Sequence, residues 1–191
     1  VGLAFPLQNL MMSVAIGTGV GINALLSKSL GEKNQNLVNR TAANGIFLEL
    51  MSALLCMVLA LLVTRIFFVV QTDIPRIIEY GSSYLFICMF FCIPVFGQIT
   101  FERLLLSTGK TVYSMITQAF GAVLNIILDP IFIFVLDWGI AGAAWATTIS
   151  MSVGGIVSLA HFIDRKSFIR FRQHAWVPKL YIFRNIMLIG I

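Results

Sequence analysis

The stretch NIILDPIFIF, from Asn125 to Phe134, places a carboxylate and a proline side by side inside an apolar run. Asp129 is the single charged residue between positions 115 and 135, a run long enough to cross a bilayer. An ionised Asp near the centre of a membrane-spanning helix costs about 2.5–3.5 kcal/mol on insertion scales. The stretch therefore predicts a membrane-spanning helix whose buried carboxylate has a functional use.

The whole chain has the composition of a membrane protein. Of its 191 residues, 59% are hydrophobic and 11% are charged, and the mean hydropathy is +0.94. Soluble domains average about 25% charged residues. Five runs reach the roughly 20 residues that a helix needs to cross the hydrocarbon core. We therefore predict an all-α, polytopic transmembrane helical bundle, with helices over approximately 5–26, 43–70, 80–105, 113–135 and 138–163.

These five helices are expected to form one transmembrane bundle over residues 1–163. Residues 164–184 mix basic and aromatic side chains, which is typical of an amphipathic linker on an anionic cytoplasmic leaflet. Residues 185–191, NIMLIGI, are predicted to begin a sixth span. Because the chain starts without Met and stops inside this apolar stretch, we interpret it as an internal fragment of a longer protein.

The distribution of basic residues predicts the orientation. All but two of the 13 basic residues lie in the connections after the first, third and fifth runs, the exceptions being Arg65 and Arg76. The positive-inside rule places those three connections in the cytoplasm. We expect a multi-pass protein of the cell membrane, in contact with membrane lipid. The basic residues are spread over separate loops, which argues against a nucleic-acid partner.

A polar stripe runs along the helix that contains the opening stretch. Its members recur at helical spacing and share one face: Gln118, Ala122, Asn125 and Asp129. Such a face should be turned toward protein or water. Pro130 cannot donate a hydrogen bond to the carbonyl of Ile126, and this carbonyl would complete an oxygen-rich pocket for Na⁺ or a proton. The alternative is that Asp129 only bonds a neighbouring helix and Pro130 only shapes a kink.

The fourth and fifth runs are close in sequence and predict a tight antiparallel hairpin. Residues at equal distances from its turn should lie side by side, which sets Thr147 level with Asp129 and Ser150 level with Asn125. Thr147 is then a candidate ligand and Ser150 a candidate polar lining residue, as is Gln118. A Thr147 hydroxyl bonded to the carbonyl of its own helix, at Ala143, is the alternative.

Four other polar residues have weaker assignments. Tyr84 has a similar depth to Asp129 and either joins the site or belongs to an outer aromatic belt. Glu49 is expected near the cytoplasmic start of its helix, as secondary polar lining or as an interfacial residue. Glu102 and Arg103 are expected at the inner end of the third run, as a local charge pair or a loop contact.

Small residues and prolines predict how the helices pack. Gly17 and Gly21 are spaced as GxxxG, which favours close approach of two helices. Pro6 and Pro94 are expected to kink the first and third runs. No constellation of catalytic groups is present in the sequence, so we predict neither an enzyme nor a bound cofactor.

Three sequence motifs carry a resemblance to a known family. They are GVGINALLSKSLGEKNQNLVNR at 19–40, LLSTGKT at 105–111, and NIILDPIFIF followed by GIAGAAWATTIS at 139–150. Together they resemble the multidrug and toxic compound extrusion (MATE) transporters. The resemblance implies twelve helices in two six-helix lobes, of which this chain would supply the second to sixth helices of the N-terminal lobe. The missing partners would be the first helix and the C-terminal lobe of the same chain.

The resemblance also implies a function and a site. Similar proteins are secondary antiporters that export organic, often cationic, drug-like compounds in exchange for Na⁺ or H⁺. Their N-lobe cation site uses an Asn and an Asp four residues apart, which match Asn125 and Asp129. A Thr on the sixth helix matches Thr147, and a nearby Tyr matches Tyr84. Na⁺ would lie between Asn125, Asp129 and Thr147, and a further Asp of the family would precede Val1.

Two other functions remain open at this stage. The main alternative is a lipid-linked oligosaccharide or polysaccharide flippase of related architecture, in which basic residues often line the cavity. The spans here hold acids and no central Lys or Arg, which favours a cationic cargo. The second alternative is a membrane subunit that does not transport.

Overall fold

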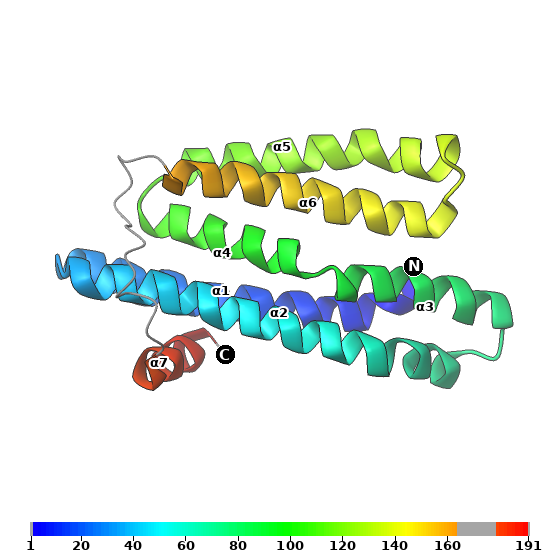
Figure 1. Ribbon diagram of the computed structural model, residues 1–191, viewed down its shortest axis with the longest axis horizontal. Helices are drawn as coiled ribbons and strands as arrows, with labels where there is room; N and C mark the ends of the chain where they lie inside the picture. Colours follow the sequence, from blue (N-terminus) through cyan, green and yellow to red (C-terminus); the bar gives the residue numbers. More distant parts are fainter. Residues whose placement is uncertain (1, 164–178, 191) are drawn as a thin grey trace.

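The computed structural model describes residues 2–163 and 179–190, and it is helical without a strand throughout these ranges (Figure 1). The predicted all-α class is therefore confirmed. In chain order the elements are the 3₁₀ turn η1 (Gly2–Ala4), α1 (Phe5–Gly31), α2 (Gln35–Gln71), α3 (Pro75–Phe90), α4 (Ile93–Ser107), α5 (Thr111–Pro130), the π-helix η2 (Ile131–Val135), α6 (Gly139–Ile163) and α7 (Leu180–Gly190).

The helices form a bundle of roughly parallel rods. Helices α5 and α6 lie together on one side, α1 and α2 lie on the other, and α4 runs between the two pairs (Figure 1). Four helices are long and apolar enough to cross a membrane, and α3 with α4 makes a fifth span if the bent pair is counted as one. The chain is thus a polytopic membrane protein.

Helices α1 and α2 extend beyond the apolar runs from which they were predicted. Helix α2 begins at Gln35 rather than at 43, because the side chain of Asn34 accepts a hydrogen bond from the Leu37 N–H at 3.1 Å and caps the helix. Helix α1 likewise continues to Gly31. Hydropathy marks only the part of a helix that lies in hydrocarbon, so these polar ends were not predicted.

The predicted single helix over 80–105 is wrong, because α3 and α4 meet at an angle of 46°. The break falls at Phe91 and Cys92, just before Pro94 in the first turn of α4, where a proline is readily accommodated. The predicted kink at Pro94 is confirmed. Pro6 lies in the first turn of α1 and introduces no bend there.

Helix α7 packs against α1 through the predicted glycines. A Cβ atom added at Gly21 would collide with the carbonyl oxygen of Ile186, and one added at Gly190 would collide with that of Gly17. The two backbones therefore touch, which confirms the packing interpretation of the GxxxG pair. Ile182 and Ile186 are fully buried against the apolar cluster that includes α1, α2 and α4.

Contacts to α2 fix the start of α7. The Lys179 N–H donates to the Asn44 side-chain oxygen at 2.9 Å, and the rings of Phe47 and Phe183 stack with centroids 6.0 Å apart. The helix begins at Leu180 rather than at 185, so the last part of the predicted linker is helical. The rest of that linker, 164–178, lies outside the described residues.

This packing predicts that a side chain at Gly21 will displace α7. We expect Gly21→Leu to lower the stability of the full-length protein by about 1–3 kcal/mol, the usual cost of overpacking, as a fall in its thermal unfolding midpoint in detergent. Gly31→Leu is the matched control, since nothing lies within 4 Å of a Cβ at Gly31. Equal midpoints for the two variants would contradict the close contact.

Candidate functional site

The hairpin of α5, η2 and α6 holds the candidate cation-binding residues. Its turn contains Asp137 and Gly139 with φ angles of 53° and 52°, and the Trp138 N–H donates to the Phe132 carbonyl at 3.1 Å. At Gly142, a Cβ would lie only 2.6 Å from that same carbonyl oxygen. The lack of a side chain at Gly142 therefore lets α6 lie directly against the end of α5 and fixes the register of the pair.

This register brings Asn125, Asp129 and Thr147 together. The Asn125 amide nitrogen lies 3.5 Å from Asp129 Oδ1 and 3.5 Å from Thr147 Oγ1. Both distances are at the outer limit of a hydrogen bond, about half an ångström beyond the usual length. The amide is therefore loosely held between two oxygens, and the group is only partly buried.

The structure confirms the own-helix bond of Thr147, and its role as a ligand stays a prediction. Its hydroxyl donates to the Ala143 carbonyl at 3.0 Å, as expected for a helical Thr. The single hydroxyl proton is thereby used, and the oxygen lone pairs are left for Asn125 or for a cation. Thr147 can thus bond within its helix and still act as a ligand.

Pro130 changes the helix type rather than bending the span sharply. The α-helical pattern ends at Pro130 and continues as a π-helix, in which the Leu136 N–H donates to the Ile131 carbonyl at 2.9 Å. Residues Thr111–Val135 still form one span, unlike the bent pair of α3 and α4. The Ile126 side chain is 70% exposed and points away from the bundle. A role of its carbonyl as a ligand stays a prediction.

Tyr84 lies inside the bundle and not in a lipid-facing belt. Its side chain is 7% exposed on α3, interacts with Gln8 of α1 and Cys88 of its own helix, and is within electrostatic range of Asp129. The aromatic-belt alternative is therefore wrong. Gln8 was not predicted, although a single amide in an apolar run is the signal that could have identified it.

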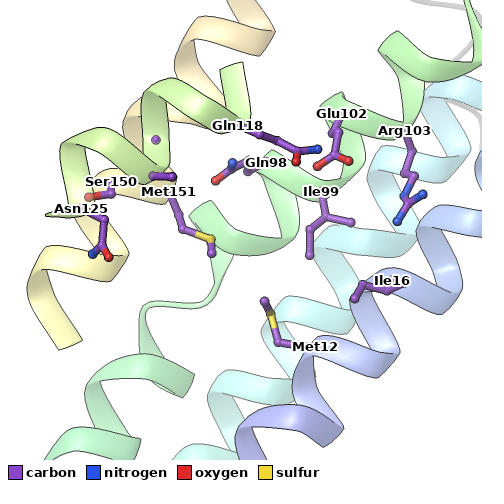
Figure 2. A pocket seen from close by; sticks show the side chains of 12 residues that line it. Met12, Ile16, Gln98, Ile99, Glu102, Arg103, Gln118, Asn125, Ser150 and Met151 are labelled. Carbon is purple, nitrogen blue, oxygen red and sulfur yellow. The ribbon is translucent and has the colours of Figure 1, made fainter. Parts of the chain in front are cut away.

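A cavity of about 430 Å³ lies between α1, α4, α5 and α6 (Figure 2). Its wall contains Gln118, Asn125 and Ser150, which are three of the polar residues predicted from spacing. Ser150 donates to the Ala146 carbonyl at 2.7 Å. Asn125 belongs both to this wall and to the group with Asp129 and Thr147, so it connects the two.

The far wall of this central cavity was not predicted. Figure 2 shows the Gln118 side chain directed toward Glu102, with Arg103 beside Glu102, whereas the Gln98 amide is turned toward α5 and α6. Glu102 interacts with both Gln118 and Arg103, and Arg103 Nε is buried without a hydrogen-bond partner in the described part of the chain. Of the two alternatives for Glu102 and Arg103, their interaction fits the local charge pair, and both residues lie in the last turns of α4, which ends at Ser107.

Two glycines of α6 explain why Gln98 reaches the cavity. A Cβ at Gly154 would lie 3.1 Å from Gln98 Nε2, and the Gln98 backbone lies against Gly155. Gln98 and Glu102 are four residues apart and share one face of α4. That spacing, together with the amide at Gln98, is the signal that the sequence offered.

Glu49 lies apart from this site, buried between α1 and α2. It is about four turns from the start of α2 at Gln35. Its side chain is 2% exposed and lies 2.6 Å from the Thr18 hydroxyl of α1. Glu49 is not among the residues that line the central cavity, and its depth in the membrane stays a prediction.

Comparison with known proteins identifies the family. A sequence profile of the MatE family matches residues 1–131. The chain belongs to the MatE family. This confirms the resemblance found in the motifs, and the apolar helices agree with a multi-pass membrane protein. The matched segment includes Asn125 and Asp129, whereas Thr147 lies beyond it.

Two MatE relatives carry curated names. The chain is 27% identical over 199 residues to the multidrug export protein MepA of Staphylococcus haemolyticus, covering 100% of this chain and 42% of the relative. It is 28% identical over 152 residues to the multidrug and toxin extrusion protein 2 of Mus musculus, covering 78% of this chain and 26% of the relative. The chain thus spans less than half the length of the curated relatives it matches.

Solved MatE-type structures share the fold. A MATE crystal structure in complex with MaL6 superposes with a TM-score of 0.94 at 25% identity, covering 100% of this chain and 42% of that one. An inward-facing structure of a multidrug resistance MATE family transporter of the MOP superfamily superposes with a TM-score of 0.93 at 24% identity, covering 99% of this chain and 43% of that one. An outward-facing structure with the same description superposes with a TM-score of 0.93 at 25% identity, covering 100% of this chain and 42% of that one.

We predict that the central cavity is filled with water. In the full-length protein, Ala122→Cys places a thiol in the cavity wall, and a polar maleimide should label it at least about tenfold faster than Val123→Cys, because thiol reactivity follows exposure to water. Val123 is 55% exposed but does not line the cavity. The native cysteines are buried and give a low background. Equal labelling of the two variants would show that the cavity is not open to water.

Proposed function

We propose that the full-length protein is a secondary active efflux antiporter that exports organic, cationic drug-like compounds in exchange for Na⁺ or H⁺. The observation that carries this proposal is the double position of Asn125, which touches both the Asp129 carboxylate and the wall of the central cavity. The relatives named as multidrug export and extrusion proteins support it. The MatE membership does not favour the flippase alternative.

The cation is proposed to bind among Asn125, Asp129 and Thr147. The Asp129 carboxylate and the Thr147 hydroxyl supply two oxygens, and a rotation of the Asn125 amide would supply a third. Oxygen ligands suit a hard cation such as Na⁺, and the carboxylate alone can accept a proton. Tyr84, buried within electrostatic range of Asp129, would shield this group from lipid.

Coupling is proposed to pass through the Asn125 amide. A cation or proton on Asp129 takes up lone pairs of the carboxylate and weakens its hydrogen bond with the Asn125 amide, so the amide can turn and alter the hydrogen-bonding groups of the cavity wall. The cargo then meets a different wall with and without the cation. A coupling free energy of this kind is reciprocal, so the cargo must weaken cation binding to the same extent as the cation weakens cargo binding.

The cavity wall supports a broad range of cargo. Met12 and Met151 present flexible thioether side chains, which adapt to differently shaped apolar groups. Gln98 and Gln118 add amide groups that can donate and accept hydrogen bonds. The Asp129 carboxylate, in contact with Asn125 of the cavity wall, would supply the negative charge that favours a cation.

The orientation follows the basic loops. The connections α1–α2 and α4–α5 lie at the same end of the bundle (Figure 1) and carry Lys33 and Lys110, with Lys28 in the last turn of α1. We place this end in the cytoplasm and the protein in the cell membrane. A first helix and a C-terminal lobe of the same chain would close the open side of the cavity.

Removal of the carboxylate charge tests the proposal. In the full-length protein, Asp129→Asn is expected to abolish the Na⁺ or pH dependence of substrate efflux from proteoliposomes and to reduce its rate by at least about tenfold, because the variant cannot exchange a cation. Asp137→Asn changes an exposed acid in the turn of the same hairpin and should behave as wild type. Wild-type efflux with unchanged coupling in Asp129→Asn would refute the mechanism.

The hydroxyl at Thr147 provides a second, finer test. Thr147→Val removes one ligand at almost constant volume. It should raise the half-saturating concentration of the coupling cation about tenfold to hundredfold, the usual effect of losing a bond to a charged group. Thr147→Ser keeps the oxygen and should remain close to wild type. Identical cation dependence in the Val and Ser variants would exclude Thr147 as a ligand.

A further inference from the structure

A second buried acid lies between α1 and α2, away from the proposed cation site. Glu49 and Thr18 are only 2% and 1% exposed, and Glu49 Oε1 lies 2.6 Å from Thr18 Oγ1. This distance is at the short end of the range for hydroxyl hydrogen bonds. The other carboxyl oxygen, Oε2, is buried and has no hydrogen-bond partner within the described residues.

The number of protons available for hydrogen bonds between Glu49, Thr18 and the Val14 carbonyl decides the protonation state of Glu49. The Thr18 oxygen also lies 2.8 Å from the Val14 carbonyl oxygen. A carbonyl and an ionised carboxylate only accept hydrogen bonds, whereas the hydroxyl has a single proton. With an ionised Glu49, one of these two short contacts would set two acceptors against each other.

A neutral Glu49 resolves this conflict. The carboxylic acid then donates its proton to Thr18 Oγ1, and the Thr18 hydroxyl donates to the Val14 carbonyl, as helical Thr residues commonly do. The unpartnered Oε2 is then the oxygen of a neutral acid. Leaving such an oxygen without a bond costs far less than leaving a buried carboxylate oxygen without one.

The surroundings of Glu49 also disfavour a charge. A small cavity of about 100 Å³ lies beside it between α2 and α4, and its wall is apolar apart from Glu49 and Thr100. The Thr100 hydroxyl donates to the Phe96 carbonyl at 2.7 Å and is not directed at the acid. Cys56, on the same helix, is a titratable group within electrostatic range of Glu49.

Within the described residues, no basic group of the neighbouring helices is bonded to Glu49. Arg103 of α4 packs against Gly19, next to Thr18, and lines the central cavity. Lys179, before α7, places its ammonium 5.8 Å from the centre of the Tyr181 ring. Across residues 2–163 and 179–190, the structure gives Glu49 no basic partner, and Thr18 is the partner that it does have. An ionised Glu49 would thus be a buried charge without compensation.

We propose that Glu49 is a proton-binding site distinct from the Asn125–Asp129–Thr147 group, and that it is protonated in this arrangement of α1 and α2. Loss of the proton requires either a different hydroxyl direction at Thr18 or water in the adjacent cavity, whose volume equals that of about three water molecules. A proton is therefore bound more tightly in the packed arrangement than in a loosened one, and pH biases the α1–α2 contact. This inference holds whichever cation drives efflux.

Infrared difference spectroscopy of the full-length protein in lipid tests the protonation directly. At neutral pH, we expect one carboxylic acid C=O band that is present in wild type and in Asp129→Asn but absent from Glu49→Gln. The Gln side chain can donate to Thr18 in the same way as the acid, so this variant should fold. Retention of every carboxylic acid band in Glu49→Gln would overturn the proposal.

Substitutions of Thr18 keep the proposal testable without changing the acid. Thr18→Val removes the acceptor and should shift the Glu49 C=O band to higher frequency, whereas Thr18→Ser keeps the hydroxyl and should leave the band in place. An unshifted band in Thr18→Val, or a band that disappears in Asp129→Asn instead, would show that the proton is not at Glu49. The readout is a side-chain vibration, so its outcome is independent of whether the antiport proposal succeeds.

Discussion

Hydrocarbon offers no hydrogen bonds, and every polar side chain in a membrane-spanning helix must find its partners inside the protein or in trapped water. This constraint determines which faces of the helices meet. On α5, large apolar side chains such as Ile116, Phe120 and Val123 are exposed on the outer surface, while Gln118 and Asn125 line the central cavity. The same helix therefore presents one face to lipid and the other to the proposed transport pathway.

The backbone follows the same rule. Pro130 has no N–H, and the chain responds by changing from an α-helix to a π-helix within one span. Gly142 lets α6 approach the Phe132 carbonyl, which accepts the Trp138 N–H at the turn. The proline and the glycine thus act together, because the irregular end of α5 remains satisfied through its contact with α6. Asp129 is held at the point where these adjustments begin.

The parts of the site that could be predicted are those that depend on local geometry. A short turn between two antiparallel helices fixes which residues are level. This argument set Thr147 level with Asp129, and the structure places the Thr147 hydroxyl at the Asn125 amide, one turn away from Asp129 on α5. Gln98, Glu102 and Arg103 were missed as cavity residues because α4 is separated from α3 by a break, which moves its face out of the register expected for one straight helix.

The position of Glu49 depends on long-range packing. Hydropathy placed the start of its helix at 43, since the polar first turns of α2 do not resemble a membrane span. The acid is buried because its face of α2 is turned toward Thr18 of α1. Its partner on α1 could not be inferred, because neither periodicity nor turn geometry fixes how α1 and α2 are rotated about their axes.

Solved structures with the same fold bear on how a cation could act on the cargo in the proposed mechanism. Structures named as inward-facing and outward-facing both superpose on this chain with a TM-score of 0.93, so the fold of this half is nearly the same in both. In the proposed mechanism, the lobe therefore moves as one body, and binding at Asp129 need not reshape the bundle. A cation can shift the access equilibrium only if its affinity differs between the two states. In this mechanism, the difference in affinity arises at the surface that the lobe presents to the cavity. There the loosely held amide of Asn125 contacts Asp129 and Thr147, and it can rotate without disturbing the packed core.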